Sequence, residues 1–394
     1  MLLLFAEAVL VFLVAVAGGA AALFRVPFRK FFRRGMWTLL LPPFLFAYGF
    51  IIERNIYEVK ETYIVSERIP EAFDGYRIVQ LSDIHLSSFS KRAGSLERAV
   101  KKVNGLAPDV ILFTGDMITF SPDELNERLM KVLSGLEAPD GIYAVLGNHD
   151  YCTYAGYSDE AGRVRAVDSL IAKEESMGWK VLLDCNTAIV RESPDDTGTQ
   201  VHGQAGADDG RDTLYIAGVR NISASSHFIS DGDLDRALEG AGDSFTVLMS
   251  HDPSHWRTEV VYRDDIDLML SGHTHAMQLA LFGWSPISFL YKEYSGLYER
   301  SVSGAVPRTE ADRNTEVDPK GGISRLAKMR KPQCTVVHED FRSERNEEST
   351  LLGRPHEGVS GTQYLYVNTG LGETGFPARI GVPPEITLIT LKSR

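Results

Sequence analysis

The chain has 394 residues, of which 44% are hydrophobic, and this is long enough to bury a full α/β core. Its net charge of −12 argues against nucleic acid as a main partner, because phosphate backbones are bound by clustered Lys and Arg. An acidic enzyme can still take a phosphate substrate if metal ions supply the local positive charge. The cysteines Cys152, Cys185 and Cys334 show no CxxC spacing and say little about redox compartment.

The N-terminal region predicts attachment to a membrane. Residues 1–24 are nearly all apolar, with Glu7 the only charge, and are long enough to cross a bilayer. A secretory signal peptide fits poorly, because there is no basic n-region and the apolar stretch is too long. A basic, Phe-containing loop follows at 25–34, and then a second apolar run, Met36 to Ile52. We expect a membrane anchor over 1–52, with one or two transmembrane segments, and a linker over 53–74.

Two topologies stay open for this anchor. In a hairpin of two spans, the basic loop remains in the cytoplasm and everything after Ile52 lies outside. With one span and an interfacial second segment, the catalytic part would stay in the cytoplasm, and the basic-aromatic cluster could lie among the headgroups. We favour the hairpin, which predicts an extracytoplasmic catalytic domain anchored in the inner or cytoplasmic membrane.

From Gly75 onward, apolar strand patterns alternate with helical ones. We expect strands at 77–81, 110–114, 142–146, 181–183, 188–190, 214–219, 245–249, 268–270, 365–368 and 386–391. Helices are expected near 96–103, 125–133, 164–177 and 234–238. This alternation predicts an α/β domain over 75–394 with a largely parallel sheet and functional groups at the carboxyl ends of its strands. Two stretches, 193–212 and 300–363, are predicted to be surface insertions.

Five predicted strand ends carry side chains that bind metals. The segments are LSDIH at 81–85, FTGD at 113–116, VLGNHD at 145–150, LMSHD at 248–252 and LSGHTH at 270–275. A single pair such as DxH occurs by chance on turns, but five such segments in this order would rarely arise without a metal site. Together they predict a hydrolytic centre with two metal ions.

The residue types suit such a centre. Asp83 and His85 are two apart on an extended strand end, so both point to one side and can hold one ion. Asp116 has two carboxylate oxygens and can bridge two cations. Asn148 offers a neutral amide oxygen, which adds no charge to an anionic site.

Three histidines complete the candidate ligands, namely His251, His273 and His275. Imidazole nitrogens favour Mn, Zn or Fe over Ca or Mg. Two ions about 3.5–4 Å apart would lower the pKa of a water, neutralise phosphate oxygens and align the nucleophile. His149, at the rim beyond Asn148, could then protonate the leaving alkoxide as a general acid.

Weaker candidates lie outside these segments. Arg220 ends a predicted strand and could bind a substrate phosphate. Aromatic residues gather after the last motif, where they could pack in the core or form a hydrophobic rim that admits lipid tails. They are Phe282, Trp284, Phe289, Tyr291, Tyr294 and Tyr298.

The five segments resemble the signature blocks of calcineurin-like metallophosphoesterases, and most closely those of the membrane-associated bacterial branch. The resemblance covers 75–296 and 366–391 and implies a four-layer α/β/β/α sandwich. It implies one metal on Asp83, His85 and His275, a second on Asn148, His251 and His273, a bridging Asp116, and His149 as the catalytic acid.

Three positions depart from the family pattern. Thr119 stands where members usually carry Asp or Asn, which in the protein phosphatases orients the catalytic histidine, so the charge state of His149 stays open. Phe120 replaces the Arg that clamps phosphate in the phosphatase branch, which weakens any protein-phosphatase interpretation. Ala276 replaces a common glycine after the last histidine, which is harmless if its φ is negative.

These features predict a membrane-anchored phosphoric ester hydrolase with two divalent metal ions, acting on a mono- or diester that could be lipid-linked. The alternative is a UDP-2,3-diacylglucosamine pyrophosphatase of lipid A biosynthesis, which requires a cytoplasmic domain because nucleotide sugars are made there. A non-catalytic scaffold is remote, since it would be expected to lose ligands. Besides the substrate and the membrane, no protein or nucleic acid partner is evident.

Overall fold

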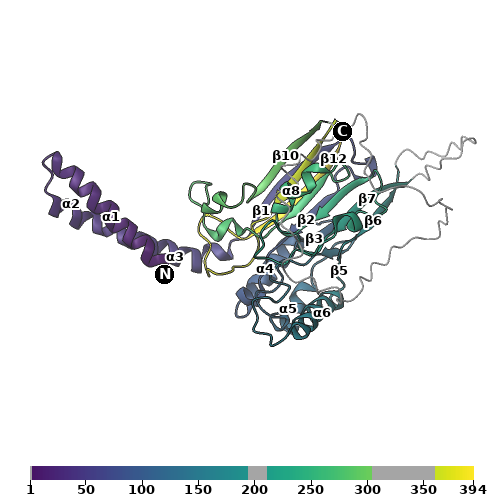
Figure 1. The fold of residues 1–394 in the computed structure, drawn as a ribbon, viewed down its shortest axis with the longest axis horizontal. Helices are drawn as coiled ribbons and strands as arrows, with labels where there is room; N and C mark the ends of the chain where they lie inside the picture. Colours follow the sequence, from purple (N-terminus) through teal and green to yellow (C-terminus); the bar gives the residue numbers. More distant parts are fainter. Residues whose placement is uncertain (1, 194–210, 304–359) are drawn as a thin grey trace, which may run out of the picture.

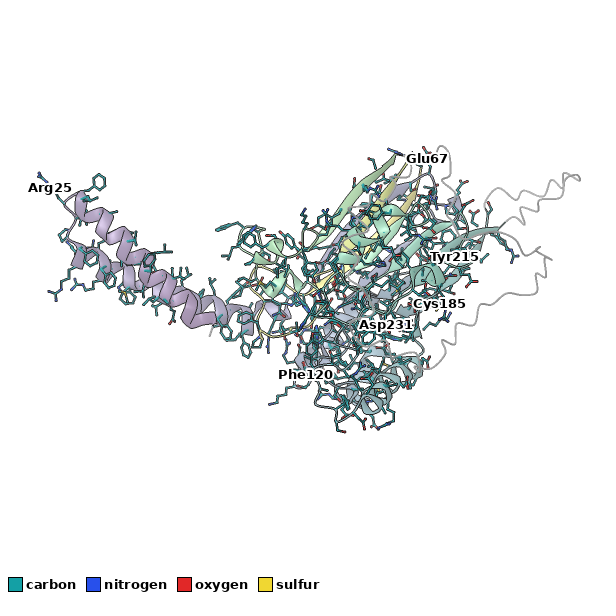
Figure 2. All side chains as sticks on the ribbon, viewed as in Figure 1. Arg25, Glu67, Phe120, Cys185, Tyr215 and Asp231 are labelled. Atoms are coloured by element: carbon teal, nitrogen blue, oxygen red, sulfur yellow. The ribbon has the colours of Figure 1, made fainter. Side chains whose placement is uncertain are left out.

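The computed structural model describes the backbone of residues 2–193, 211–303 and 360–394. A helical arm extends from a domain built of two β-sheets (Figure 1). The arm contains α1 (Leu2–Leu23), α2 (Phe28–Gly35), the 3₁₀ helix η1 (Met36–Leu40), α3 (Leu41–Ile51) and η2 (Glu53–Asn55). Arg25 lies at the tip of the arm farthest from the domain (Figure 2).

The arm is a helical hairpin in which α1 runs back along α2, η1 and α3. A Cβ atom at Gly35 would clash with Val14, so this glycine is needed for the close approach of the two helices. By length and composition, one helix in the described part of the chain could cross a membrane, over Phe28–Asn55, while Glu7–Leu23 is a shorter apolar helix. The prediction of several transmembrane helices is therefore corrected to one. A helix of this kind near the N-terminus suits a membrane anchor and a signal sequence alike.

The segment predicted to be a linker contains an edge strand. β1 (Glu58–Ser66) pairs in parallel with β12 (Glu385–Ser393), from Glu58 opposite Glu385 to Ser66 opposite Ser393. Only Ile64 of β1 is buried, so the strand lacks the apolar run by which the more central strands are recognised. A short helix, η3 (Glu71–Phe73), joins it to the next strand.

Two six-stranded mixed sheets form the domain. The first has the order β1-β12-β2-β3-β4-β5, with β2 (Arg77–Leu81), β3 (Val110–Phe113), β4 (Ile142–Ala144) and β5 (Lys180–Val181). The second has the order β10-β11-β9-β8-β7-β6, with β6 (Cys185–Glu192), β7 (Arg211–Gly218), β8 (Phe245–Met249), β9 (Leu268–Ser271), β10 (Gly296–Ser303) and β11 (Ser360–Val367). Among the strands that the structure describes, β2 with β12, β6 with β7, and β10 with β11 pair antiparallel, and the other neighbours pair in parallel.

The buried apolar residues show how the sheets and helices are layered. Between the sheets, residues such as Ile78, Val110, Val247 and Leu268 form one buried apolar layer. The outer face of the first sheet packs on α4 (Ala93–Asn104), α5 (Glu127–Leu133) and α6 (Glu160–Ser176). The second sheet packs on α7 (Leu234–Ala237), α8 (Ser254–Thr258) and η6 (Val260–Tyr262). The predicted α/β class is confirmed, with two mixed sheets.

The predicted insertions lie mostly outside the described residues. Their ends belong to strands, since 211–212 are in β7, 300–303 in β10 and 360–363 in β11. Four further short helices occur in the connecting loops, namely η4 (Leu86–Phe89), η5 (Pro122–Glu124), η7 (His275–Gln278) and η8 (Pro286–Phe289). η4 directly follows the predicted ligand His85, and η7 begins at the predicted ligand His275.

Candidate metal centre

The loops after β2 and β9 face each other across the two sheets and bring three predicted ligands together. The Asp83 Oδ1 atom lies 3.1 Å from His275 Nε2 and 3.9 Å from His85 Nε2. The two histidine Nε2 atoms are 3.1 Å apart. These side chains are buried, and the short distances show that their ligand atoms are turned toward one another. They can hold one cation between them.

Asp116, in the loop after β3, stands between this group and the next. Its Oδ2 atom lies 3.5 Å from His85 Nε2 and 3.2 Å from His251 Nε2. His251 Nδ1 donates a hydrogen bond to the Thr114 carbonyl at 2.7 Å, so its Nε2 atom is the one turned inward. A carboxylate in this position can be shared by two cations.

The remaining predicted ligands lie beside His251. The ring centroids of His251 and His273 are 5.2 Å apart, and Asn148 Oδ1 lies 2.8 Å from His273 Nδ1. The Nε2 atom of His251 is buried and has no hydrogen-bond partner within the described part of the chain. Burial would lower the pKa of His251, but the Asp116 carboxylate outweighs burial and raises that pKa to about 10. A cation bound here would replace the proton, because a metal-binding imidazole nitrogen must be deprotonated. The donor set of carboxylate, amide and imidazole fits two divalent transition-metal ions.

Several of these ligands have a left-handed backbone. The φ angles are +50° at Asp83, +42° at His85, +59° at Asp116, +70° at His273 and +50° at His275. Left-handed conformations are uncommon for residues other than glycine and cluster at functional sites, where the surrounding structure maintains them. Main-chain hydrogen bonds between the loops provide that support, from Asp83 N to Gly115 O at 2.9 Å and from His85 N to Asp116 O at 3.1 Å.

Asp150 holds two of the loops in register, a role that sequence reasoning missed. Its carboxylate accepts hydrogen bonds from the backbone N–H of Asp116 at 2.7 Å, Gly147 at 2.9 Å and Ile118 at 3.1 Å. Burial and the nearby Asp116 charge raise the pKa of Asp150 to about 7. Gly147 has no room for a Cβ atom, which would clash with Asp116. The only sequence signal was the place of Asp150 in the GNHD segment.

Electrostatics keep the acidic ligands ionised. Burial alone would raise the pKa of Asp83, but the neighbouring His275 and His251 outweigh burial and hold that pKa below its usual range. The pKa of Asp116 is likewise held low against burial, by His251 and His149. Burial lowers the pKa of His85 to about 3, so this imidazole is neutral and able to bind a metal.

His149 lies at the rim of the centre, where the sequence placed it. Its Nδ1 atom donates a hydrogen bond to the Thr119 backbone carbonyl at 2.8 Å, which leaves Nε2 available for proton transfer. The ring packs edge-on against His85, with centroids 4.8 Å apart, and lies tilted against the ring of Tyr154, with centroids 4.5 Å apart. The main chain of Thr119 therefore orients His149, and the missing family Asp or Asn does not leave the ring without an orienting partner.

Ala276 does not meet the condition of a negative φ under which it would replace glycine without cost. Its φ is +44°, and the next two residues, Met277 and Gln278, have φ of +57° and +53°. With His275, they form a left-handed turn that ends the ligand segment. The Thr274 hydroxyl accepts a hydrogen bond from Ala276 N at 3.2 Å and helps to hold this turn.

Arg220 lies in an ion-pair cluster. Its Nε atom donates to Asp184 Oδ2 at 2.5 Å and its Nη1 atom donates to Asp231 Oδ2 at 3.0 Å. These carboxylates already neutralise the guanidinium, so the structure does not support Arg220 as a ligand of substrate phosphate. Its role here is to join the loop after β7 to that after β5.

Two residues near the ligands were not predicted. The Tyr291 hydroxyl lies 2.9 Å from His273 Nε2, on the side of the ring away from Asn148. Arg379 is fully buried behind His275, with Nη2 donating to the Thr369 carbonyl at 3.0 Å and lying 3.4 Å from His275 Nδ1. No local pattern marks Arg379, because it lies far from the ligand segments in sequence.

Comparison with known proteins agrees with this geometry. The model of the calcineurin-like phosphoesterase family matches residues 76–277, which contain all of the predicted ligands. The chain belongs to this family. This calcineurin-like phosphoesterase is therefore a metal-dependent phosphoric ester hydrolase, and its His and Asp clusters are consistent with the dinuclear site of the family.

Three relatives of this phosphoesterase show the range of its similarity. The transmembrane protein with metallophosphoesterase domain of Danio rerio is 30% identical over 68% of this chain and 56% of its own length. The uncharacterized metallophosphoesterase YkuE of Bacillus subtilis is 27% identical over 93% of this chain and 98% of its own length. The UDP-2,3-diacylglucosamine pyrophosphatase LpxG of Chlamydia trachomatis is 28% identical over 62% of this chain and 77% of its own length.

Proposed function

We propose that this phosphoesterase hydrolyses a phosphate mono- or diester with two divalent cations, of Mn, Zn or Fe. Asp83, His85 and His275 would hold one, and Asn148, His251 and His273 the other. Asp116 would be shared, and its position between His85 and His251 is the observation on which the proposal rests. Such ions supply a water of lowered pKa and neutralise the phosphate oxygens.

His149 would move the proton that the leaving group needs. With its Nδ1–H held by the Thr119 carbonyl, the protonated ring can donate only from Nε2. Donation of this proton to the departing oxygen lets the group leave as an alcohol in place of an alkoxide.

Substrates with different leaving groups separate the role of His149 as proton donor from that of Asp116 as metal ligand. We expect His149→Gln to lower kcat/KM about 10²- to 10³-fold for an alkyl phosphate, and much less for p-nitrophenyl phosphate, whose phenolate leaves without a proton. Asp116→Asn should abolish turnover of both and lower metal content. The exposed His227→Gln serves as the matched control and should change neither. Equal losses on both substrates for His149→Gln would contradict the general-acid role.

We also propose that the helical arm anchors the domain to a membrane. The helix over 28–55 has the length and composition of a span, and the relative from Danio rerio is named a transmembrane protein. The arm carries Arg25 and the basic residues of α2 at its far tip, where they would meet the cytoplasmic surface and leave the domain outside. Protease accessibility of the domain in intact cells and in spheroplasts tests this sidedness.

A second candidate is hydrolysis of UDP-2,3-diacylglucosamine, favoured by the likeness to LpxG. This substrate requires a cytoplasmic domain. Turnover of the purified full chain on UDP-2,3-diacylglucosamine, compared with simpler lipid phosphates, decides between the candidates. A non-catalytic scaffold is disfavoured, because Asp83, His85, Asp116, His251 and His275 are present and form clusters that could hold a metal ion.

A further inference from the structure

A loop rich in exposed apolar side chains follows the last ligand segment. We call residues 277–290 the rim loop. Phe282, Phe289 and Leu290 are 107%, 81% and 79% exposed, and Met277, Leu281 and Trp284 are also exposed. Elsewhere in the described part of the domain, large exposed apolar residues occur singly or in pairs. A patch of exposed apolar side chains of this kind marks a site that interacts with a membrane or with another apolar surface.

The rim loop is joined to the base of the helical arm through residues 374–380. Ala280 N donates to the Ile380 carbonyl at 2.8 Å, and Ile380 N donates to the Gln278 carbonyl at 2.9 Å. The Gln278 side chain also donates to the Phe376 carbonyl at 2.6 Å. The loop is therefore fixed to this segment by both main-chain and side-chain hydrogen bonds.

Residues 374–380 in turn pack on α3. The rings of Phe46 and Phe376 meet edge-on with centroids 5.4 Å apart. Arg379 N donates to the Gly49 carbonyl at 3.4 Å, and a Cβ atom at Gly49 would lie 2.8 Å from Ile380 Cγ1. The rim loop thus lies beside the domain-proximal end of the apolar helix (Figure 1).

The rim loop is also fixed to the metal centre at both of its ends. It begins two residues after His275, in the left-handed turn. Just beyond its other end, the Tyr291 hydroxyl contacts His273 Nε2, and the Tyr294 carbonyl accepts from the Thr274 hydroxyl at 2.6 Å. A surface that the loop contacts will therefore lie next to the predicted ligands.

We propose that the rim loop enters the interfacial region of the bilayer beside the anchoring helix, so that the metal centre acts at the membrane surface on a phosphate ester borne by a bilayer lipid. This inference rests on the proposed function and names its substrate class. The bilayer is the occupant because the exposed surface continues the apolar surface of the arm. Phe and Trp are residues of membrane interfaces, and the exposed Lys292 can meet anionic headgroups.

Depth-dependent quenching tests the membrane contact without any assay of activity. The full chain is reconstituted in phosphatidylcholine vesicles with brominated acyl chains, and the emission of Trp284 is obtained by difference from a Trp284→Phe variant. We expect brominated lipid to quench this emission by more than half and aqueous acrylamide to quench it little. Strong quenching by acrylamide with none by brominated lipid would overturn the proposal.

The substrate class is tested with two phosphatidic acids that share a headgroup. Dioleoyl phosphatidic acid is presented in vesicles and dihexanoyl phosphatidic acid in free solution. In the Phe282→Asp/Phe289→Asp variant, kcat/KM should fall at least tenfold for the long-chain lipid and less than twofold for the short-chain one. Tyr63→Asp, which changes an exposed aromatic residue of β1 toward the Glu67 end of the domain, is the matched control and should alter neither (Figure 2).

The outcomes distinguish this inference from the proposed function. Equal turnover of the long-chain lipid by the wild type and the double variant would overturn the inference, as would turnover of the short-chain compound alone. If the wild type hydrolysed neither lipid nor p-nitrophenyl phosphate, the proposed function would fail. The quenching of Trp284 would still decide whether the loop meets the bilayer.

Discussion

Thr119 contacts two histidines of the site through different atoms, one a predicted metal ligand and the other the predicted general acid. Its carbonyl accepts from His149 Nδ1, and its hydroxyl lies 3.4 Å from His85 Nδ1. Removal of a group that hydrogen-bonds to a metal-binding side chain typically lowers metal affinity or activity about 10- to 100-fold. We expect Thr119→Ala to weaken metal binding at His85 about tenfold, because the hydroxyl beside its Nδ1 atom is lost. The ratio of the rates on alkyl and aryl phosphates, which reports on His149, should stay as in the wild type, because the main-chain carbonyl remains.

Titration with Mn²⁺ in a calorimeter and turnover of alkyl and aryl phosphates measure these two effects. Ser90→Ala, at an exposed position near the end of η4, is a suitable control for loss of a hydroxyl. If Thr119→Ala abolished the leaving-group dependence, the main-chain carbonyl would not be the group that orients His149.

Ala276 has a backbone conformation that glycine adopts at lower cost. An L-residue in the left-handed region costs about 1–2 kcal/mol relative to glycine. With φ at +44°, Ala276→Gly should raise the free energy of unfolding by about 1 kcal/mol. Ala99→Gly, inside α4, should lower it by about the same amount. Chemical denaturation measures both, and a destabilising Ala276→Gly would contradict the left-handed turn.

Glu174 is a buried carboxylate that the metal centre does not use. Neither carboxylate oxygen has a hydrogen-bond partner within the described residues, and burial raises its pKa well above 4.5. The folded state therefore binds this proton more tightly than the unfolded chain does. The resulting stabilisation is complete below about pH 4.5 and is lost as the pH rises through the raised pKa.

Glu174→Gln removes this titration. The variant should match the wild type in stability near pH 4 and exceed it by about 1–3 kcal/mol at pH 8, because the cost of a buried, unpaired carboxylate disappears. Glu97→Gln, at an exposed position of α4, controls for the change in net charge. Thermal unfolding over that pH range measures the difference, and a constant difference between the two proteins would refute the assignment.

At the scale of elements, the loops after β3 and β4 depend on each other through Asp150. Its three backbone hydrogen bonds would be lost in Asp150→Ala, leaving buried N–H groups unpaired. We expect a loss of about 2–4 kcal/mol of stability and a parallel loss of bound metal. Asp159→Ala, which removes the helix cap of α6, should cost about 1 kcal/mol and spare the metal. Metal content after gel filtration distinguishes them.

The elements that sequence reasoning found are those with a buried apolar face. β2 and β8 have the predicted bounds, and the predicted face of α4, with Leu96, Ala99 and Val103, is buried. β1 was predicted as a linker because an edge strand buries little. The end of β10 was predicted to belong to the insertion at 300–363, because it borders a polar segment. Edge strands lack the burial that produces a recognisable pattern.

The candidate site was easier to predict than its surroundings. The ligand types and their spacing were visible in the sequence, since each follows an apolar strand. Their left-handed backbone, the turn at Ala276 and the burial of Arg379 were not visible, because φ angles and long-range contacts leave no local signal in these segments. The ion pairs of Arg220 were not visible for the same reason, since Asp184 and Asp231 are not its neighbours in sequence.

At the scale of the whole molecule, the helical arm, the rim loop and the metal centre lie at one end of the two sheets. Metal ions there would join loops from both sheets, so their removal should weaken the contact between the sheets as well as stop catalysis. We expect EDTA to abolish turnover and to lower Tm by several degrees, as loss of any tightly bound ligand does. Mn²⁺ or Zn²⁺ should restore both, whereas Ca²⁺ should not.

The central claim is that side chains from both sheets share two cations through Asp116. Elemental analysis of the purified full chain, after loading with Mn²⁺ and removal of excess ion, tests it most directly. The wild type should retain about two ions per chain, and Asp116→Asn fewer than one, with turnover of p-nitrophenyl phosphate lost in parallel. Full turnover with no retained metal, or unchanged metal content in Asp116→Asn, would contradict the account.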